Sequence, residues 1–289
     1  MTCDKNEIRC KNVKNKNLFL YLCLAVLFFS CRNFQNQEDS FSIFLPSNIL
    51  DYRGTPSSPG DRSSLAFSDQ GAWFAYGFPN AEEKTLGFSG PFLMTQGQGE
   101  WSSKALSHLE LIHEGTQEKL DLHDFSSSQT SYNSHLKQVL ENEKLKIEQN
   151  LFFNSPHSAI ITTKITNLSN EVVTLQPDWH GTAFSTGLQI TKEENTISLK
   201  TDRSTAKGII QVFEGVIKTL ITSDSSYSIS LKDIKLEADE TTTLTIAHTF
   251  IFPEYDVVVE QQELELSAKN PQRQLQKRIE EKTRQLSTL

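Results

Sequence analysis

The sequence predicts an all-β fold, an antiparallel β-sandwich that ends in a C-terminal linker α-helix. Two observations support this prediction. Short segments rich in β-branched and aromatic residues recur through residues 143–252, separated by clusters of Ser, Asp, Asn and Gly. Helical periodicity is nearly absent before the last segment, Gln272–Leu289. Many short strands at close spacing are typical of an antiparallel sandwich or barrel.

Residues 1–31 have the order of a secretory signal peptide. A basic region precedes the apolar run Leu18–Phe29, which ends at Ser30 and Cys31. The run is about a dozen residues long, whereas a membrane-spanning helix needs about 20. A cysteine directly after a small residue resembles a bacterial lipobox. We therefore expect cleavage before Cys31 and acylation of its thiol, with ordinary signal-peptide cleavage nearby as the alternative.

Residues 32–50 are polar and predict a tether between the membrane and the folded domain. The four cysteines all lie at or before the expected cleavage point: Cys3, Cys10, Cys23 and Cys31. The mature chain can therefore form no internal disulfide and no thiolate metal site. The net charge of −8, with basic and acidic residues interspersed, argues against nucleic acid as a partner. We expect an exported protein, lipid-anchored in the bacterial cell envelope (periplasm or outer membrane).

Residues 51–253 carry the strand signals and are expected to form the sandwich domain. Glu143–Phe153 alternates apolar and polar positions, and Gln149 is the one polar interruption of its apolar face. Ser158–Thr166, rich in β-branched residues, leads through a turn to the short strand Val172–Leu175. Further strands are predicted at Ile197–Lys200, Gly208–Phe213, Lys218–Thr222, Tyr227–Leu231 and Thr241–Phe252.

Residues 254–289 are expected to comprise an acidic segment and the linker helix. Asn270 is a suitable helix cap, and Pro271 suits the first turn. The helix carries only a thin apolar stripe, with Leu275, Ile279 and Leu286 near helical spacing. Such a helix docks on its own domain or leads into the next one.

The motifs that could indicate a catalytic or metal site are incomplete in this sequence. Gly87–Pro91 resembles a nucleophile elbow, but Pro91 stands where that motif needs glycine. His108, His113 and His123 lack the spacing of a zinc motif, so we interpret them as surface or edge histidines. We therefore predict no catalytic residue, no metal site and no cofactor.

The densest aromatic segment, Asp69–Pro79, has two interpretations. Trp73, Phe74 and Tyr76 could form a platform on which a sugar ring stacks, with Asp69 binding its hydroxyl groups. The same rings could belong to an ordinary sandwich core. Exposure separates the two interpretations, because a platform needs at least two of the rings at the surface. Strand alternation would place Trp73 opposite to the other two rings unless the strand bulges.

This segment resembles the N-terminal domain of bacterial members of glycoside hydrolase family 63, the α-glucosidases related to the mannosyl-oligosaccharide glucosidase. The matching positions are Phe67, Asp69, Gly71-Ala72-Trp73, Pro79 and Gly87-Phe88-Ser89-Gly90. Asn154–Ser158, leading into Thr163–Thr166, is similar to a second strand of the family. Gln272–Leu289 is similar to the linker helix that precedes the family's catalytic domain.

The resemblance implies a β-super-sandwich, which in the family packs against an (α/α)6 barrel that supplies both catalytic carboxylates. The sequence ends before any such barrel. We therefore expect a non-catalytic domain of oligosaccharide metabolism, inactive alone, whose partners are an oligosaccharide, a separately encoded catalytic domain, and the membrane through its lipid. Two alternatives remain open: a surface carbohydrate-binding lipoprotein, and a structural interaction module that binds a partner through its C-terminal helix.

Overall fold

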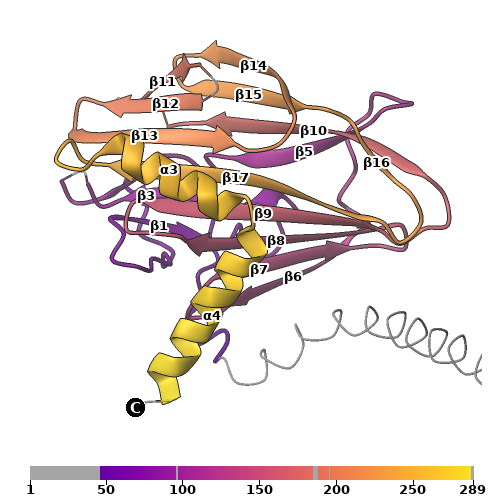
Figure 1. The fold of residues 1–289 in the computed structure, drawn as a ribbon, viewed down its shortest axis with the longest axis horizontal. Coiled ribbons are helices and arrows are strands. Elements are labelled where there is room, and N and C mark those ends of the chain that lie inside the picture. Colours follow the sequence, from indigo (N-terminus) through magenta and orange to yellow (C-terminus); the bar gives the residue numbers. More distant parts are fainter. Residues whose placement is uncertain (1–45, 96, 185–187, 195, 288–289) are drawn as a thin grey trace, which may run out of the picture. The chain divides into compact units, whose positions relative to one another are not determined.

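The computed structural model describes residues 46–95, 97–184, 188–194 and 196–287. The expected signal peptide, Cys31 and most of the tether lie outside these residues. The described chain is built mainly of antiparallel strands, followed by two helices (Figure 1). The predicted all-β sandwich with a C-terminal helix is confirmed.

The larger sheet has eight strands in the order β11-β12-β13-β17-β9-β8-β7-β6. Its strands are β6 (Ser126–Ser131), β7 (Leu136–Glu141), β8 (Leu145–Phe153), β9 (Ser158–Asn167), β11 (Leu188–Glu193), β12 (Thr196–Thr201), β13 (Ser204–Val212) and β17 (Thr241–Ile251). The central strands β9 and β17 are rich in β-branched residues, which suit a pleated surface that is covered on both faces.

The smaller sheet has the order β14-β15-β10-β5-β2, and β16 pairs with one end of β10. Its strands are β2 (Leu86–Gly87), β5 (His108–His113), β10 (Val173–Thr182), β14 (Val216–Ser223), β15 (Ser226–Leu231) and β16 (Ile234–Leu236). A third sheet joins β1 (Phe74–Gly77), β3 (Ser89–Leu93) and β4 (Glu100–Trp101).

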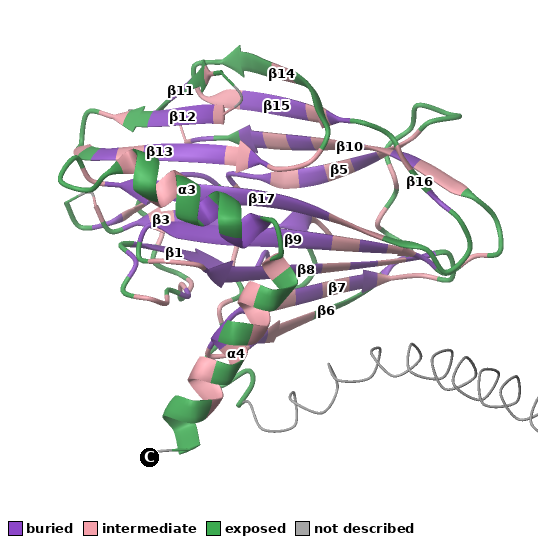
Figure 2. Cartoon of the chain, viewed as in Figure 1, coloured by how far each residue is buried: buried purple, intermediate pink, exposed green. Residues whose placement is uncertain are grey.

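One continuous hydrophobic core contains side chains from all three sheets. Leu109 and Trp179 reach it from the smaller sheet, Ile147 and Ile161 from the larger sheet, and Phe74 from β1. The buried residues concentrate along the strands in Figure 2. This core is the main stabilising feature, because apolar surface removed from water contributes about 25 cal/mol per Å².

Three polar side chains inside the sandwich form a hydrogen-bonded chain. Gln149 accepts a hydrogen bond from Gln138 at 2.6 Å and donates one to Thr163 at 2.8 Å. The polar interruption seen in the sequence is therefore part of a buried hydrogen-bonded chain, which removes the penalty of an unpaired amide.

A second buried network surrounds His248. Its Nδ1 lies 2.8 Å from the Tyr76 hydroxyl, and its Nε2 lies 2.7 Å from the Ser107 hydroxyl. The Ser107 hydroxyl also contacts the hydroxyl of Tyr227. Burial lowers the pKa of His248 to about 3, so the imidazole is neutral in the folded protein at physiological pH.

The helices are α3 (Val257–Ala268) and α4 (Pro271–Ser287). Asp256 caps α3 by accepting a hydrogen bond from the Val258 backbone N–H at 2.9 Å. Leu264 of α3 and Leu275 of α4 join a separate apolar cluster with Phe152 and Ile160 of the larger sheet. Since β8 and β9 also send Ile147 and Ile161 into the main core, this cluster lies on the opposite, outer face of that sheet.

The sequence predicted α4 but not α3. The apolar residues of α3 are spread around the helix, so that Leu264 is buried while Val258 and Leu266 are exposed. No one-sided stripe marked this segment as a helix. Across the part of the chain that the structure describes, neither helix is long and apolar enough to span a lipid bilayer.

Candidate functional site

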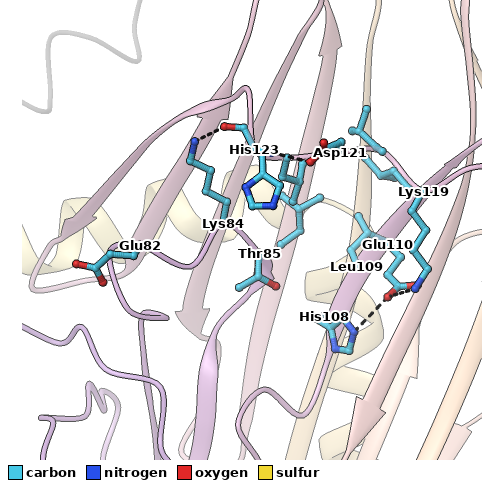
Figure 3. A pocket seen from close by; sticks show the side chains of 13 residues that line it. Glu82, Lys84, Thr85, His108, Leu109, Glu110, Lys119, Asp121 and His123 are labelled. Atoms are coloured by element: carbon cyan, nitrogen blue, oxygen red, sulfur yellow. Dashed lines mark hydrogen bonds and ion pairs between the residues drawn. The ribbon is translucent and has the colours of Figure 1, made fainter.

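An open hollow of about 460 Å³ lies beside the β2–β5 edge of the smaller sheet (Figure 3). Most of its ionisable side chains come from β5 and from the segment that follows it. The charged and titratable side chains that line it are Glu82, Lys84, His108, Glu110, Lys119, Asp121 and His123. Figure 3 shows His123 and Lys84 on one side of the hollow and Glu110, Lys119 and His108 on the other.

The register of β5 and β10 gathers four polar side chains on the outer face of the smaller sheet. His108 stands opposite His180, and Glu110 stands opposite Asp178. Side chains alternate along each strand, so the residues between them, such as Leu109, enter the core. The cluster therefore follows directly from the strand pairing.

Glu110 is the centre of this cluster. Its Oε2 lies 2.7 Å from Lys119 Nζ and 3.1 Å from His180 Nε2, and its Oε1 lies 3.8 Å from His108 Nε2. His180 Nε2 also lies 3.4 Å from Asp178 Oδ2. Neither contact of His180 Nε2 is aligned as a hydrogen bond. The two imidazole rings stack with their centroids 5.6 Å apart.

The surroundings shift the pKa values of His180 and His108 in opposite directions. The Asp178 side chain raises the pKa of His180, with a further contribution from Glu110. Burial lowers the pKa of His108, and the neighbouring His180 lowers it further. At one pH, His180 is therefore more readily protonated than His108, and the cluster can both donate and accept hydrogen bonds.

A second hollow, of about 440 Å³, adjoins the first. The two share Thr85 and His108 as lining residues. The second hollow has more apolar walls, contributed by Pro79, Ala105 and Phe184. A charged region and an apolar region therefore meet at His108.

The predicted aromatic platform is not formed. The exposed fractions of Phe74 and Tyr76 are 0% and 1%, whereas that of Trp73 is 58%. The prediction that Phe74 and Tyr76 bind a sugar at the surface is wrong, because both rings belong to the core and Tyr76 bonds to His248. Trp73 is the one ring of the three that is open to solvent, and its role in sugar binding stays a prediction.

The Asp69 carboxylate is bound by helix α4. Its Oδ2 lies 2.5 Å from an Arg278 guanidinium nitrogen, and its Oδ1 lies 2.7 Å from Lys282 Nζ. The side chains of Asp69 and Arg278 are only 7% and 9% exposed. Gln70 can accept from the same guanidinium at 3.0 Å, and Glu281 also pairs with it. The prediction of Asp69 as a sugar-binding residue is therefore corrected: its oxygens are occupied by α4.

The sequence contained part of the signal for the histidine cluster. The alternation of His108 and Glu110 with leucines predicts that both share one face of a strand. Their partners on β10 became evident only from the register. Within the described residues, no group of three or more His, Cys, Asp or Glu side chains has the arrangement of a metal site.

Comparison with known proteins identifies the family of the sandwich. Residues 57–282 match the family model described as the N-terminal domain of glucosidase YgjK. No curated protein resembles the sequence closely enough to count as a relative.

Two solved structures illustrate the likeness of fold. A bacterial glucoamylase complexed with acarbose matches with a TM-score of 0.50 and 13% identity, over 85% of this chain and 40% of that chain. A protein described as a kojibiose phosphorylase from the human microbiome matches with a TM-score of 0.46 and 13% identity, over 82% of this chain and 34% of that chain. The present chain thus spans less than half the length of either protein.

Proposed function

This chain belongs to the family of glucosidase YgjK N-terminal domains, and from this premise we propose that it is the non-catalytic β-sandwich of a glycoside hydrolase family 63-like α-glucosidase. In this proposal, a separate (α/α)6 domain carries out hydrolysis and the present chain is inactive alone. The sandwich supports the catalytic domain and fixes the helix that faces it.

The attachment of α4 to the sandwich is the observation that carries this proposal. Asp69, in the segment that resembles the family's opening motif, binds Arg278 and Lys282 of the helix that resembles the family's linker. The matched region spans both segments. A sandwich that holds the linker helix through a nearly buried ion pair is suited to set the position of an attached domain.

The geometry of the polar cluster also supports a non-catalytic role. Glycoside hydrolysis needs two carboxyl groups flanking the scissile bond, about 5–5.5 Å apart for retention or about 6.5–9.5 Å apart for inversion. Glu110 and Asp178 instead both contact the Nε2 atom of His180, at 3.1 and 3.4 Å. Both carboxylates are therefore in contact with an imidazole, and Glu110 is also paired with Lys119.

Co-expression tests the proposal. The full chain alone should release no glucose from α-glucosides, and it should restore activity when produced with a family 63-like (α/α)6 domain from the same genome. The variant Asp69→Asn should reduce the restored activity, whereas Asp233→Asn, at an exposed position that lines neither hollow, should not. Hydrolysis by the present chain alone, or an (α/α)6 domain that neither binds nor depends on it, would refute the proposal.

We further propose that the mature protein is anchored in the cell envelope by a lipid on Cys31. The order of basic, apolar and small residues before Cys31 supports this proposal. The variant Cys31→Ala should lose membrane association, and globomycin should block processing of the wild-type precursor. Unchanged membrane retention of Cys31→Ala would contradict the lipid anchor.

A further inference from the structure

We infer that the two hollows adjoining at Thr85 and His108 form one groove that binds a short, uncharged oligosaccharide. This inference rests on the proposed function only in its choice of glucose-containing sugars. It moves the carbohydrate site from the aromatic segment around Trp73 to the β2–β5 edge of the smaller sheet.

The size and continuity of the groove are the first argument. The hollows measure about 460 and 440 Å³, and each lies within the range of about 300–1,000 Å³ that is usual for small-molecule sites. Because both are lined by Thr85 and His108, a ligand of more than one sugar ring can extend from one into the other.

The distribution of charge selects an uncharged ligand. Glu110 is already paired with Lys119 at 2.7 Å, and Lys84 Nζ donates to the backbone oxygen of His123 at 2.5 Å. An anion or a cation that binds beside Glu110 or Lys84 would have to displace one of these contacts. Lys104, in the wall of the second hollow, is exposed and takes no part in them. A sugar hydroxyl needs only a free lone pair or an N–H group, and it can act as donor and acceptor together.

His108 is placed to supply such a contact. It lines both hollows and stacks on His180, which limits rotation of its ring. Burial favours the neutral form of its imidazole, which offers one donor and one acceptor nitrogen. A neutral imidazole of this kind matches the hydroxyl pairs of a pyranose.

The apolar walls of the second hollow provide the complementary surface. Phe184, Pro79 and Ala105 lie in the part of the groove away from Glu110 and Lys119. Sugar rings have apolar C–H faces that pack on aromatic and aliphatic side chains, while their hydroxyl groups need polar partners. The groove presents a polar surface in the first hollow and a more apolar surface in the second.

Titration of the full chain with maltotriose and kojibiose, followed by saturation-transfer NMR and calorimetry, tests the inference. Wild-type protein should bind at least one of these sugars. His108→Ala should weaken binding at least tenfold, and the near-isosteric Thr85→Val should weaken it at least threefold. The matched control His113→Ala, on the same strand but outside both linings, should stay within twofold of wild type. Glucose 6-phosphate and maltobionate serve as charged comparison ligands.

Three results would overturn the inference. These are absence of binding to either neutral sugar, unchanged affinity in a folded Thr85→Val or His108→Ala protein, and tighter binding of a charged ligand than of the neutral ones. Binding is measured without any catalytic domain. Failure of the co-expression experiment together with success here would therefore favour a free carbohydrate-binding protein, whereas the reverse would leave the accessory role intact.

Discussion

Replacing Arg278 with methionine is expected to loosen helix α4 from the sandwich. The substitution keeps an apolar chain of similar reach but removes the guanidinium that contacts Asp69 at 2.5 Å. Removal of one partner from a buried ion pair costs about 3–5 kcal/mol. Lys282 still lies 2.7 Å from the same carboxylate, so we expect a smaller loss of about 2–3 kcal/mol in the free energy of helix docking.

Hydrogen exchange measured by mass spectrometry resolves this effect. A loss of about 2–3 kcal/mol corresponds to about 30- to 150-fold faster exchange in the amides of α4, while amides of the central strands β8 and β9 should be unchanged. The matched control is Arg284→Met, an exposed position in the last turn of the same helix. Equal exchange rates in the two variants would show that the ion pair does not hold the helix, and the reasoning would fail.

Three further predictions concern the core. Lowering the pH from 6.5 towards 3 should reduce the free energy of unfolding by about 1.4 kcal/mol per pH unit through His248. The pKa of this histidine is about 3 in the folded protein and about 6.5 in the unfolded chain, so only the unfolded state binds the extra proton in this range. Urea unfolding at several pH values should show a smaller slope in His248→Gln, and an unchanged slope would contradict the prediction. Phe74→Ala should cost about 3–5 kcal/mol and Trp73→Ala about 0.5 kcal/mol, because only Phe74 is buried; similar midpoints of thermal unfolding would contradict the core assignment. Gly181→Ala should destabilise by more than about 3 kcal/mol, because its Cβ would lie 2.0 Å from a backbone oxygen, whereas Gly60→Ala, with open space around it, should be nearly neutral in the same assay.

Local sequence patterns were enough to predict several of the strands and the last helix. The predicted strand Ser158–Thr166 corresponds to β9 (Ser158–Asn167), and the predicted helix Gln272–Leu289 contains most of α4 (Pro271–Ser287). For β9 the signal is its concentration of β-branched residues, and for α4 it is the near-helical spacing of Leu275, Ile279 and Leu286. Elements whose local sequence carries neither signal were not predicted.

The short strands show why some elements could not be predicted from the local sequence. β3 contains glycine and proline, and β6 consists only of serine, threonine and glutamine. Neither has a strong preference for extended structure, and each is a strand because a neighbouring strand supplies its hydrogen bonds, β1 and β4 for β3 and β7 for β6. β10 likewise continues to Thr182, beyond the predicted Val172–Leu175, because β5 and β15 pair along its length.

The sequence by itself determined the sandwich class, the apolar faces of its long strands and the terminal helix, since each depends on residues that are neighbours along the chain. Tertiary structure alone decided which candidate residues face solvent. It buried Phe74 and Tyr76, joined Asp69 to Arg278 across 209 residues, and set His108 against His180 through the register of two strands. Contacts of this kind are fixed by long-range packing, which leaves no periodic trace in the local sequence.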